Sequence, residues 1–206
     1  MRQATGRINP SSAANQVSIQ LALDGHSFSR SGAPGPAAGE GTQPQEPLTV
    51  EIVTPRTLLV PETLFAPERA ALLLAADGKR PQADETVVWS DPADGVVAVM
   101  AVPAEALASL PEARRRYTTP LLHPMSPTQP TLRLQLVGGY LYIKCWHAGL
   151  RLAEVVPAPT EADLLYVLER LETEFPASQY ALRIAGPRAK ELTKLLGHLY
   201  PDTRCE

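Results

Sequence analysis

The sequence is poor in aromatic residues and in long apolar runs, and each shortage narrows the kind of protein it encodes. Phe, Trp and Tyr make up 5% of the 206 residues, so aliphatic side chains must build the core. The longest apolar run is Val96–Val102, which is far shorter than the roughly 20 residues that a membrane-spanning helix needs. Because Gly95 and Pro103 bracket this run, we expect a buried strand there and no membrane span.

Cysteine and basic residues are also scarce. The two cysteines, Cys145 and Cys205, lie far apart, and the first sixteen residues lack the apolar stretch of a secretory signal. We therefore expect a cytoplasmic protein with free thiols. The net charge is −3 and the pI about 5.8, and the one basic cluster, Arg114–Arg116, is expected to end a helix that starts at Pro103. Nucleic-acid binding needs a wider basic stripe and aromatic platforms, so we predict none.

Proline is present in excess, with 21 residues, and gathers in two stretches. Residues 31–47 mix proline with glycine and predict a flexible loop, and residues 118–130 predict a Pro-rich linker. With a disordered tail at 1–16, these stretches divide the chain into a first half, 17–117, and a second half, 131–206. The P-x-x-P spacing within the linker also suits a docking peptide in the polyproline II conformation, which is the alternative to a stiff link.

Hydrophobic periodicity predicts an α/β protein. Strands are expected at 16–23, 26–30, 48–53, 58–61, 86–90, 96–102, 132–136, 140–146, 150–156 and 181–186. Helices are expected at 65–76, 103–116, 160–175 and 192–199. The second half thus reads strand, strand, strand, helix, strand, helix, and the first half follows nearly the same order with one extra strand near Trp89. We expect two lobes that arose by duplication of one βββαβα unit.

This repeated βββαβα order resembles the actin, sugar kinase and heat-shock-ATPase superfold, which has a ribonuclease H-like architecture. The sequence is also similar to a bacterial family known as domain of unknown function 3822, found largely in Bacteroidetes. The residues that carry the similarity are 18–21 running into 23–29, 59–65 and 163–166. The resemblance implies an actin-like fold in two lobes and implies no activity, because a fold does not fix a function.

In ATP-using members of the superfold, phosphate sits between two hairpin turns, one from each half, and a carboxylate in each turn organises Mg²⁺ or water. The matching turns here are Asp24-Gly25-His26-Ser27 and Val137-Gly138-Gly139, and Ala185-Gly186-Pro187 takes the place of the turn that faces adenosine. The resemblance therefore implies a nucleotide cleft formed by Asp24, Gly25, Ser27, Gly138, Gly139 and Gly186. The second turn lacks the carboxylate, and the adenosine turn has one glycine where two are usual.

The same residues also have plain structural interpretations. Asp-Gly and Gly-Gly are typical of type I′ hairpin turns, whose two central residues need positive φ. Cys145 and His147 face the same side of a strand, where they form either a metal or nucleophile pair or a buried thiol beside a strand-end histidine. A metal site needs three or four ligands, and no motif supplies the rest, so we predict no metal site and no catalytic residue.

The sequence favours a non-catalytic scaffold or interaction protein with an unidentified protein partner and no cofactor. The alternative is a nucleotide-binding protein or weak ATPase that holds Mg-ATP at Asp24-Gly25. The two hypotheses differ in whether the space between Asp24-Gly25 and Gly138-Gly139 is open and polar.

Overall fold

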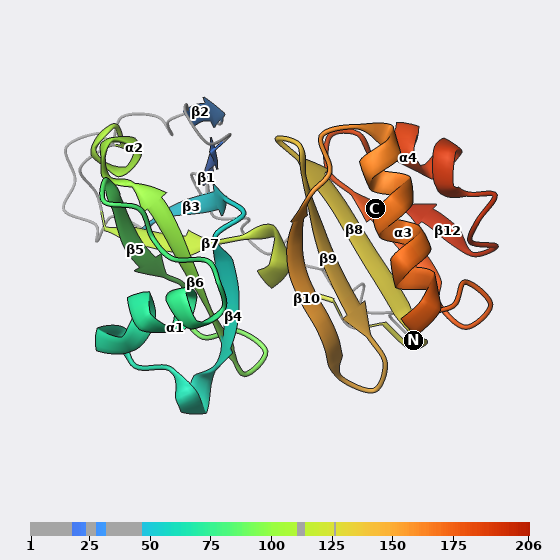
Figure 1. The fold of residues 1–206 in the computed structure, drawn as a ribbon, viewed down its shortest axis with the longest axis horizontal. Coiled ribbons are helices and arrows are strands. Elements are labelled where there is room, and N and C mark those ends of the chain that lie inside the picture. Colours follow the sequence, from blue (N-terminus) through green and yellow to red (C-terminus); the bar gives the residue numbers. More distant parts are fainter. Residues whose placement is uncertain (1–17, 24–27, 32–46, 111–113, 126) are drawn as a thin grey trace, which may run out of the picture.

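A computed structural model describes residues 18–23, 28–31, 47–110, 114–125 and 127–206. Two N-terminal sheets lie on one side of the molecule and a larger C-terminal sheet lies on the other (Figure 1). The expected tail at 1–16 and nearly all of the expected loop at 31–47 fall outside the described residues.

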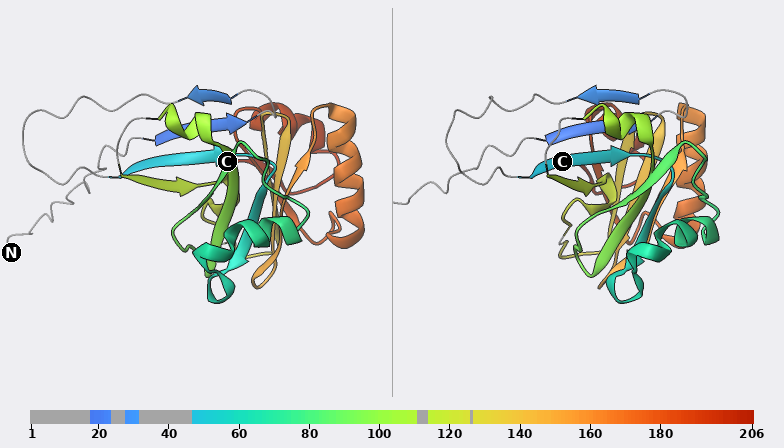
Figure 2. Two further views of the ribbon diagram at one scale, coloured as in Figure 1. Left: turned by 60° about the vertical axis from the view of Figure 1, so that its left-hand side comes forward. Right: turned by 90° about the vertical axis from the view of Figure 1, so that its left-hand side faces the viewer.

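The first N-terminal sheet has four strands. In order across the sheet they are β2 (Phe28–Ser31), β1 (Ser18–Leu23), β3 (Leu48–Val53) and β7 (Arg115–Thr118). β1 and β2 are antiparallel, whereas β3 runs parallel to both β1 and β7. Figure 2 shows this sheet extending to one side of the molecule.

The second N-terminal sheet is antiparallel. Its strands are β4 (Thr57–Pro61), β6 (Val96–Pro103) and β5 (Glu85–Trp89), and the short helices beside it are η1 (Glu62–Leu64), η2 (Pro67–Arg69), α1 (Ala70–Ala76) and α2 (Ala104–Ala108). The predicted buried strand is confirmed as β6. Met100 and Val102 pack in one cluster, and Val99 and Ala101 pack in another on the opposite face, so β6 is buried on both sides.

The C-terminal sheet follows the predicted order. Its strands are β10 (Leu150–Pro157), β9 (Tyr140–Trp146), β8 (Thr131–Val137), β11 (Ala181–Ala185) and β12 (Thr203–Cys205), and its helices are α3 (Glu161–Glu174) and α4 (Ala189–Leu196). The first three strands form an antiparallel meander, and β11 and β12 run parallel to β8.

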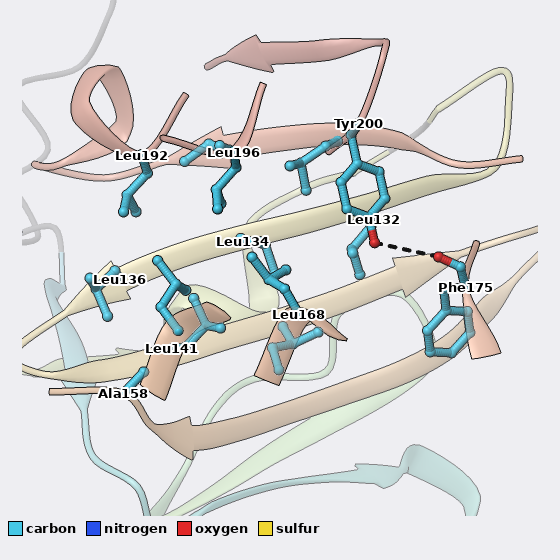
Figure 3. Close-up of a cluster of buried hydrophobic side chains, with 14 of the residues drawn as sticks. Leu132, Leu134, Leu136, Leu141, Ala158, Leu168, Phe175, Leu192, Leu196 and Tyr200 are labelled. Atoms are coloured by element: carbon cyan, nitrogen blue, oxygen red, sulfur yellow. Dashed lines mark hydrogen bonds between the residues drawn. The ribbon is translucent and has the colours of Figure 1, made fainter. Parts of the chain in front are cut away.

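Both helices cover the same face of the C-terminal sheet. Leu132 and Leu134 of β8 pack against Leu168 of α3 and Leu192 of α4 in the largest apolar cluster (Figure 3). At the edge of this cluster the Tyr200 hydroxyl donates to the Phe175 carbonyl at 3.4 Å. We refer to the opposite face of the C-terminal sheet as the polar face, because its β8 and β9 positions carry Arg133, Gln135 and Lys144.

The structure differs from the sequence-based expectation in three elements. The helix expected at 103–116 is confirmed at its start but wrong at its end: α2 ends at Ala108, and Arg115 and Arg116 belong to β7. Residues 115–118 pair in parallel with β3 and so join its sheet, with Arg115 opposite Leu48. The Arg115 guanidinium still donates to the carbonyls of Leu107 and Leu110, both at 3.1 Å, and so satisfies the C-terminal end of α2.

The other two differences lie in the first sheet and at the end of the chain. β3 lies beside β1 and does not extend the β1–β2 hairpin into a three-stranded meander. The last helix ends at Leu196, and the unexpected strand β12 follows it. In addition, the expected linker is a packed segment: it holds η3 (Pro120–Leu122), and the side chains of Leu121 and Met125 are buried.

The expected N-terminus of α3 is confirmed as a capping box. Thr160 Oγ1 accepts a bond from the Asp163 amide at 3.2 Å, and Asp163 Oδ2 accepts one from the Thr160 amide at 3.0 Å. Thr160→Ala should lower the free energy of unfolding by about 1 kcal/mol because an amide at the helix start loses its acceptor. Urea unfolding compares this variant with Thr173→Ala, an exposed change in the same helix. Equal losses in the two variants would contradict the role of the cap.

Candidate functional site

A chain of polar side chains joins the N-terminal sheets to the polar face. Glu51 of β3 lies 2.5 Å from Nε2 of His123, which follows η3. The other ring nitrogen, Nδ1, lies 3.4 Å from a terminal nitrogen of Arg133 on β8. Because a guanidinium can only donate, a hydrogen bond between Arg133 and the ring uses Nδ1 as the acceptor and leaves Nε2 to face Glu51. The His123 ring therefore bridges a carboxylate and a guanidinium.

Arg133 is the hub of this chain. Its guanidinium is nearly buried and also donates to Glu206 at 2.6 Å and to the Gln135 amide oxygen at 3.4 Å. A buried guanidinium is tolerated when several acceptors share its five N–H groups. The arrangement therefore fixes Arg133 in place on the polar face.

Lys144 on β9 lies directly opposite Arg133 in the sheet. The residue is 5% exposed, and its ammonium donates to the carbonyl of His123 at 3.2 Å. Burial, with the neighbouring charge of Arg133, lowers the pKa of Lys144, although the charge of Asp94 opposes the shift. Across the residues that the structure describes, no carboxylate forms an ion pair with this lysine.

Next to the polar chain, an apolar contact closes the space between the sheets. We name it the inter-sheet cluster, and its buried members are Val53, Leu121, Val137, Tyr142 and Val155. The Tyr142 hydroxyl donates to the carbonyl of Thr54 at 3.2 Å, and burial strongly raises the pKa of Tyr142. Tyr142 therefore stays neutral and ties β9 to the end of β3.

The structure brings two of the predicted turns to one edge of the C-terminal sheet. Gly138-Gly139 follows β8, and Gly186 follows β11, which runs parallel to β8. Asp24, Gly25 and Ser27 lie outside the described residues. Their position relative to the other two turns therefore stays a prediction.

Local packing explains the glycines in both described turns. Gly138 and Gly139 have φ values of 57° and 76°, as a type I′ hairpin turn requires, and Gly139 faces Pro159. Gly186 has φ +92°, and a Cβ there would lie 3.1 Å from Cγ of Gln135. Positive φ and close approach both demand glycine, so no ligand is needed to account for these residues.

Cys145 and His147 meet through a third side chain that the sequence did not point to. The Tyr180 hydroxyl lies 3.4 Å from Nδ1 of His147 and is also hydrogen-bonded to the Cys145 thiol. Burial raises the pKa of Cys145 to about 11, so this thiol is protonated at neutral pH and unsuited to nucleophilic chemistry. Cys145 and Cys205 are both free, as expected.

Sequence reasoning missed Glu51, His123, Arg133 and Lys144 as a group. Period-two alternation does put Arg133 and Lys144 on the faces of their strands away from the apolar core. This pattern normally indicates contact with solvent, and nothing local reveals that the segment of η3 and His123 packs on this face. Glu51 and His123 are 72 residues apart in the chain, and only the tertiary fold unites them.

Metal-ligand clusters and membrane-spanning helices are both absent from the described residues. No group of three or more His, Cys, Asp or Glu side chains there is arranged to hold a metal ion. None of the helices in the described part of the chain has the length and apolarity needed to cross a membrane.

Comparison with solved structures supports the fold. A crystal structure from Bacteroides thetaiotaomicron, described as a protein with an actin-like ATPase fold and unknown function, matches this chain with a TM-score of 0.66. The match covers 93% of this chain and 91% of the other, at 15% sequence identity. The chain therefore has an actin-like α/β fold. No family model matches it, and no curated protein matches it by sequence.

The burial of Lys144 makes a testable contribution to stability. Its pKa in the folded state lies below that in the unfolded state, so the unfolded chain binds more protons between the two values. The free energy of unfolding should therefore increase as pH rises toward the ordinary lysine pKa. Lys144→Met should remove this gain and should not weaken the protein at pH 7.

Urea unfolding at several pH values between about 7 and 10 checks this prediction. Lys194→Met, which changes an exposed lysine on α4, serves as the matched control and should keep the pH dependence of the wild type. If Lys144→Met and Lys194→Met give the same pH dependence, Lys144 does not carry a desolvation penalty.

Proposed function

We propose that this chain is a non-catalytic scaffold or interaction protein built on an actin-like fold. The observation that carries the proposal is the inter-sheet cluster. Val53 stands at the end of β3 and Val137 at the end of β8, and both are buried in that cluster. Packed side chains therefore hold the N-terminal and C-terminal sheets together at this end of the strands.

The position of the cluster bears on nucleotide binding. The resemblance to ATP-using proteins implies phosphate between the turns that follow β1 and β8. β1 runs parallel to β3, with Ala22 opposite Val53, so both strands that lead into these turns end beside the cluster. Buried side chains pack beside the ends of β3 and β8, and the described turn, Gly138-Gly139, offers no carboxylate for Mg²⁺.

Exposed apolar side chains support the interaction part of the proposal. Leu64 on η1 and Leu72 on α1 are 67% and 69% exposed, and Trp89 on β5 is 40% exposed. Trp89 packs against Phe65, with ring centroids 5.9 Å apart. Contiguous apolar surface is typical of protein contacts, and Phe65 and Trp89 are two aromatic side chains that touch there.

The two-lobed architecture belongs to the same proposal. In both the four-stranded N-terminal sheet and the C-terminal sheet, the first strand pairs antiparallel with the second on one side and parallel with a later strand on the other. This shared pairing supports a duplication in which the N-terminal copy lacks the third strand of the meander. Membership of the family known as domain of unknown function 3822 is part of the proposal as well.

One observation favours the alternative function, a nucleotide-binding protein or weak ATPase. Gly138-Gly139 and Gly186 lie at the same edge of the C-terminal sheet, as a nucleotide bound there by Asp24, Gly25, Ser27 and these three glycines would need. In this alternative Mg-ATP is the ligand, and Asp24 supplies the carboxylate.

Thermal-shift titration with Mg-ATP and Mg-ADP tests the proposal. Ligand at a hundred times its Kd would stabilise the protein by about 2.7 kcal/mol, or roughly 5–10 °C for a chain of this size. We expect no saturable shift at millimolar nucleotide. A saturable shift that Asp24→Ala abolishes and Asp84→Ala keeps would overturn the proposal in favour of the alternative, because Asp84 is an exposed aspartate in another turn.

A further inference from the structure

The polar face carries a row of four cations that lie on four adjacent strands. Lys144 of β9 is opposite Arg133 of β8, Arg133 is opposite Arg183 of β11, and Arg183 is opposite Arg204 of β12. Neighbouring strands in a sheet are about 4.8 Å apart, so these side chains stand close together on one face. We name these four residues the cation row.

Two carboxylates partly neutralise the row. Asp202 accepts bonds from Arg183 at 3.2 and 3.3 Å and pairs with Arg204 at 3.2 Å, while Glu206 pairs with Arg133. Three of the four cations bond to these two carboxylates, and Lys144 bonds to a backbone carbonyl, which leaves an excess of positive charge within the group. The hydrogen bond from Arg183 lowers the pKa of Asp202, so this carboxylate is ionised at neutral pH.

A pocket of about 450 Å³ opens over the Arg183 and Arg204 end of the row. Arg183, Arg204, Asp202 and Glu206 supply its charged surface. Its other residues come mainly from the segment that enters β8 and are Pro124, Met125, Pro127, Thr128, Gln129 and Thr131. The pocket thus combines the partly buried guanidinium of Arg183 and the exposed guanidinium of Arg204 with a partly apolar wall.

The pocket is remote from the turns implicated in nucleotide binding. Thr131 begins β8 and Asp202 directly precedes β12, so the pocket lies at the amino ends of the parallel strands. Gly138 and Gly186 follow the carboxyl ends of β8 and β11. The seven residues of β8 separate the two ends by roughly 20 Å.

We propose that this pocket binds a small molecule that carries at least two anionic oxygen groups, either phosphate or carboxylate. Arg183 and Arg204 form the centre of the site, since planar guanidinium groups pair with such oxygens through two parallel hydrogen bonds. Asp202 occupies donors of both arginines in the free protein, and the ligand takes its place. Asp202 is therefore a built-in competitor that limits affinity for weak anions, and Glu206, which pairs with Arg133, adds a second negative charge to the pocket wall.

Calorimetric titration tests the site with two probes, pyrophosphate and citrate, both without Mg²⁺. We expect saturable binding of at least one probe to the wild type. Arg183→Gln should weaken it at least about 10-fold, because charged hydrogen bonds are lost. Asp202→Asn should strengthen it several-fold, because a competing negative charge is removed. Lys190 lies on α4, which covers the opposite face of the sheet, and Lys190→Gln removes one positive charge as Arg183→Gln does. This control should leave the affinity unchanged.

The opposite signs expected for Arg183→Gln and Asp202→Asn separate specific binding from misfolding, and Glu206→Gln provides a second variant that should bind more tightly. A preference for pyrophosphate assigns the ligand to phosphate compounds, and a preference for citrate assigns it to polycarboxylates. No binding of either probe at millimolar concentration overturns the proposal, as do equal losses in Arg183→Gln and Lys190→Gln.

The outcome is independent of the proposed function. A nucleotide shift in the thermal assay that Arg183→Gln abolishes but Asp24→Ala keeps belongs to this pocket and leaves the scaffold proposal intact. A shift with the reverse pattern belongs to the hairpin turn.

Discussion

The constraint on which the rest of the structure depends is the burial of β8 and β9 on both faces. All seven residues of β8 are buried, although the strand alternates apolar and polar residues. Leu132 and its apolar neighbours pack under α3 and α4, so the polar residues between them face the N-terminal sheets. A buried guanidinium or ammonium group is costly without partners. Arg133 and Lys144 accordingly bond to His123, whose ring Glu51 holds from the other sheet.

This double burial connects the fold to the proposed function. The polar chain from Glu51 to Arg133 and the inter-sheet cluster around Tyr142 together fasten the N-terminal sheets to the C-terminal sheet. A fixed contact of this kind suits a protein that presents surfaces to partners, whereas an enzyme that closes on nucleotide needs its halves to move. The cation row begins in the same buried contact and emerges at the far edge of the sheet, where Arg204 is exposed.

Local patterns in the sequence predicted most of the C-terminal sheet. Period-two alternation located β8, β9 and β10, and helical periodicity located α3. Prediction failed where long-range pairing overrides local preference: residues 115–118 became β7 because β3 offers a parallel partner, and 203–205 became β12 beside β11. The candidate site was missed for the same reason. Alternation put Arg133 and Lys144 off the apolar core, but only the fold shows that the segment of η3 and His123 packs against them.

Amide hydrogen exchange is the most direct test of the claim that the sheets are fastened together by side-chain packing. The amides of β3 and of β8 and β9 that border the inter-sheet cluster should exchange only through openings close in free energy to global unfolding. Their protection should not change when Mg-ATP is added. Exchange through a low-energy opening that exposes Val53 and Tyr142 together, and that Mg-ATP suppresses, would contradict a fixed contact and indicate a cleft that closes on nucleotide.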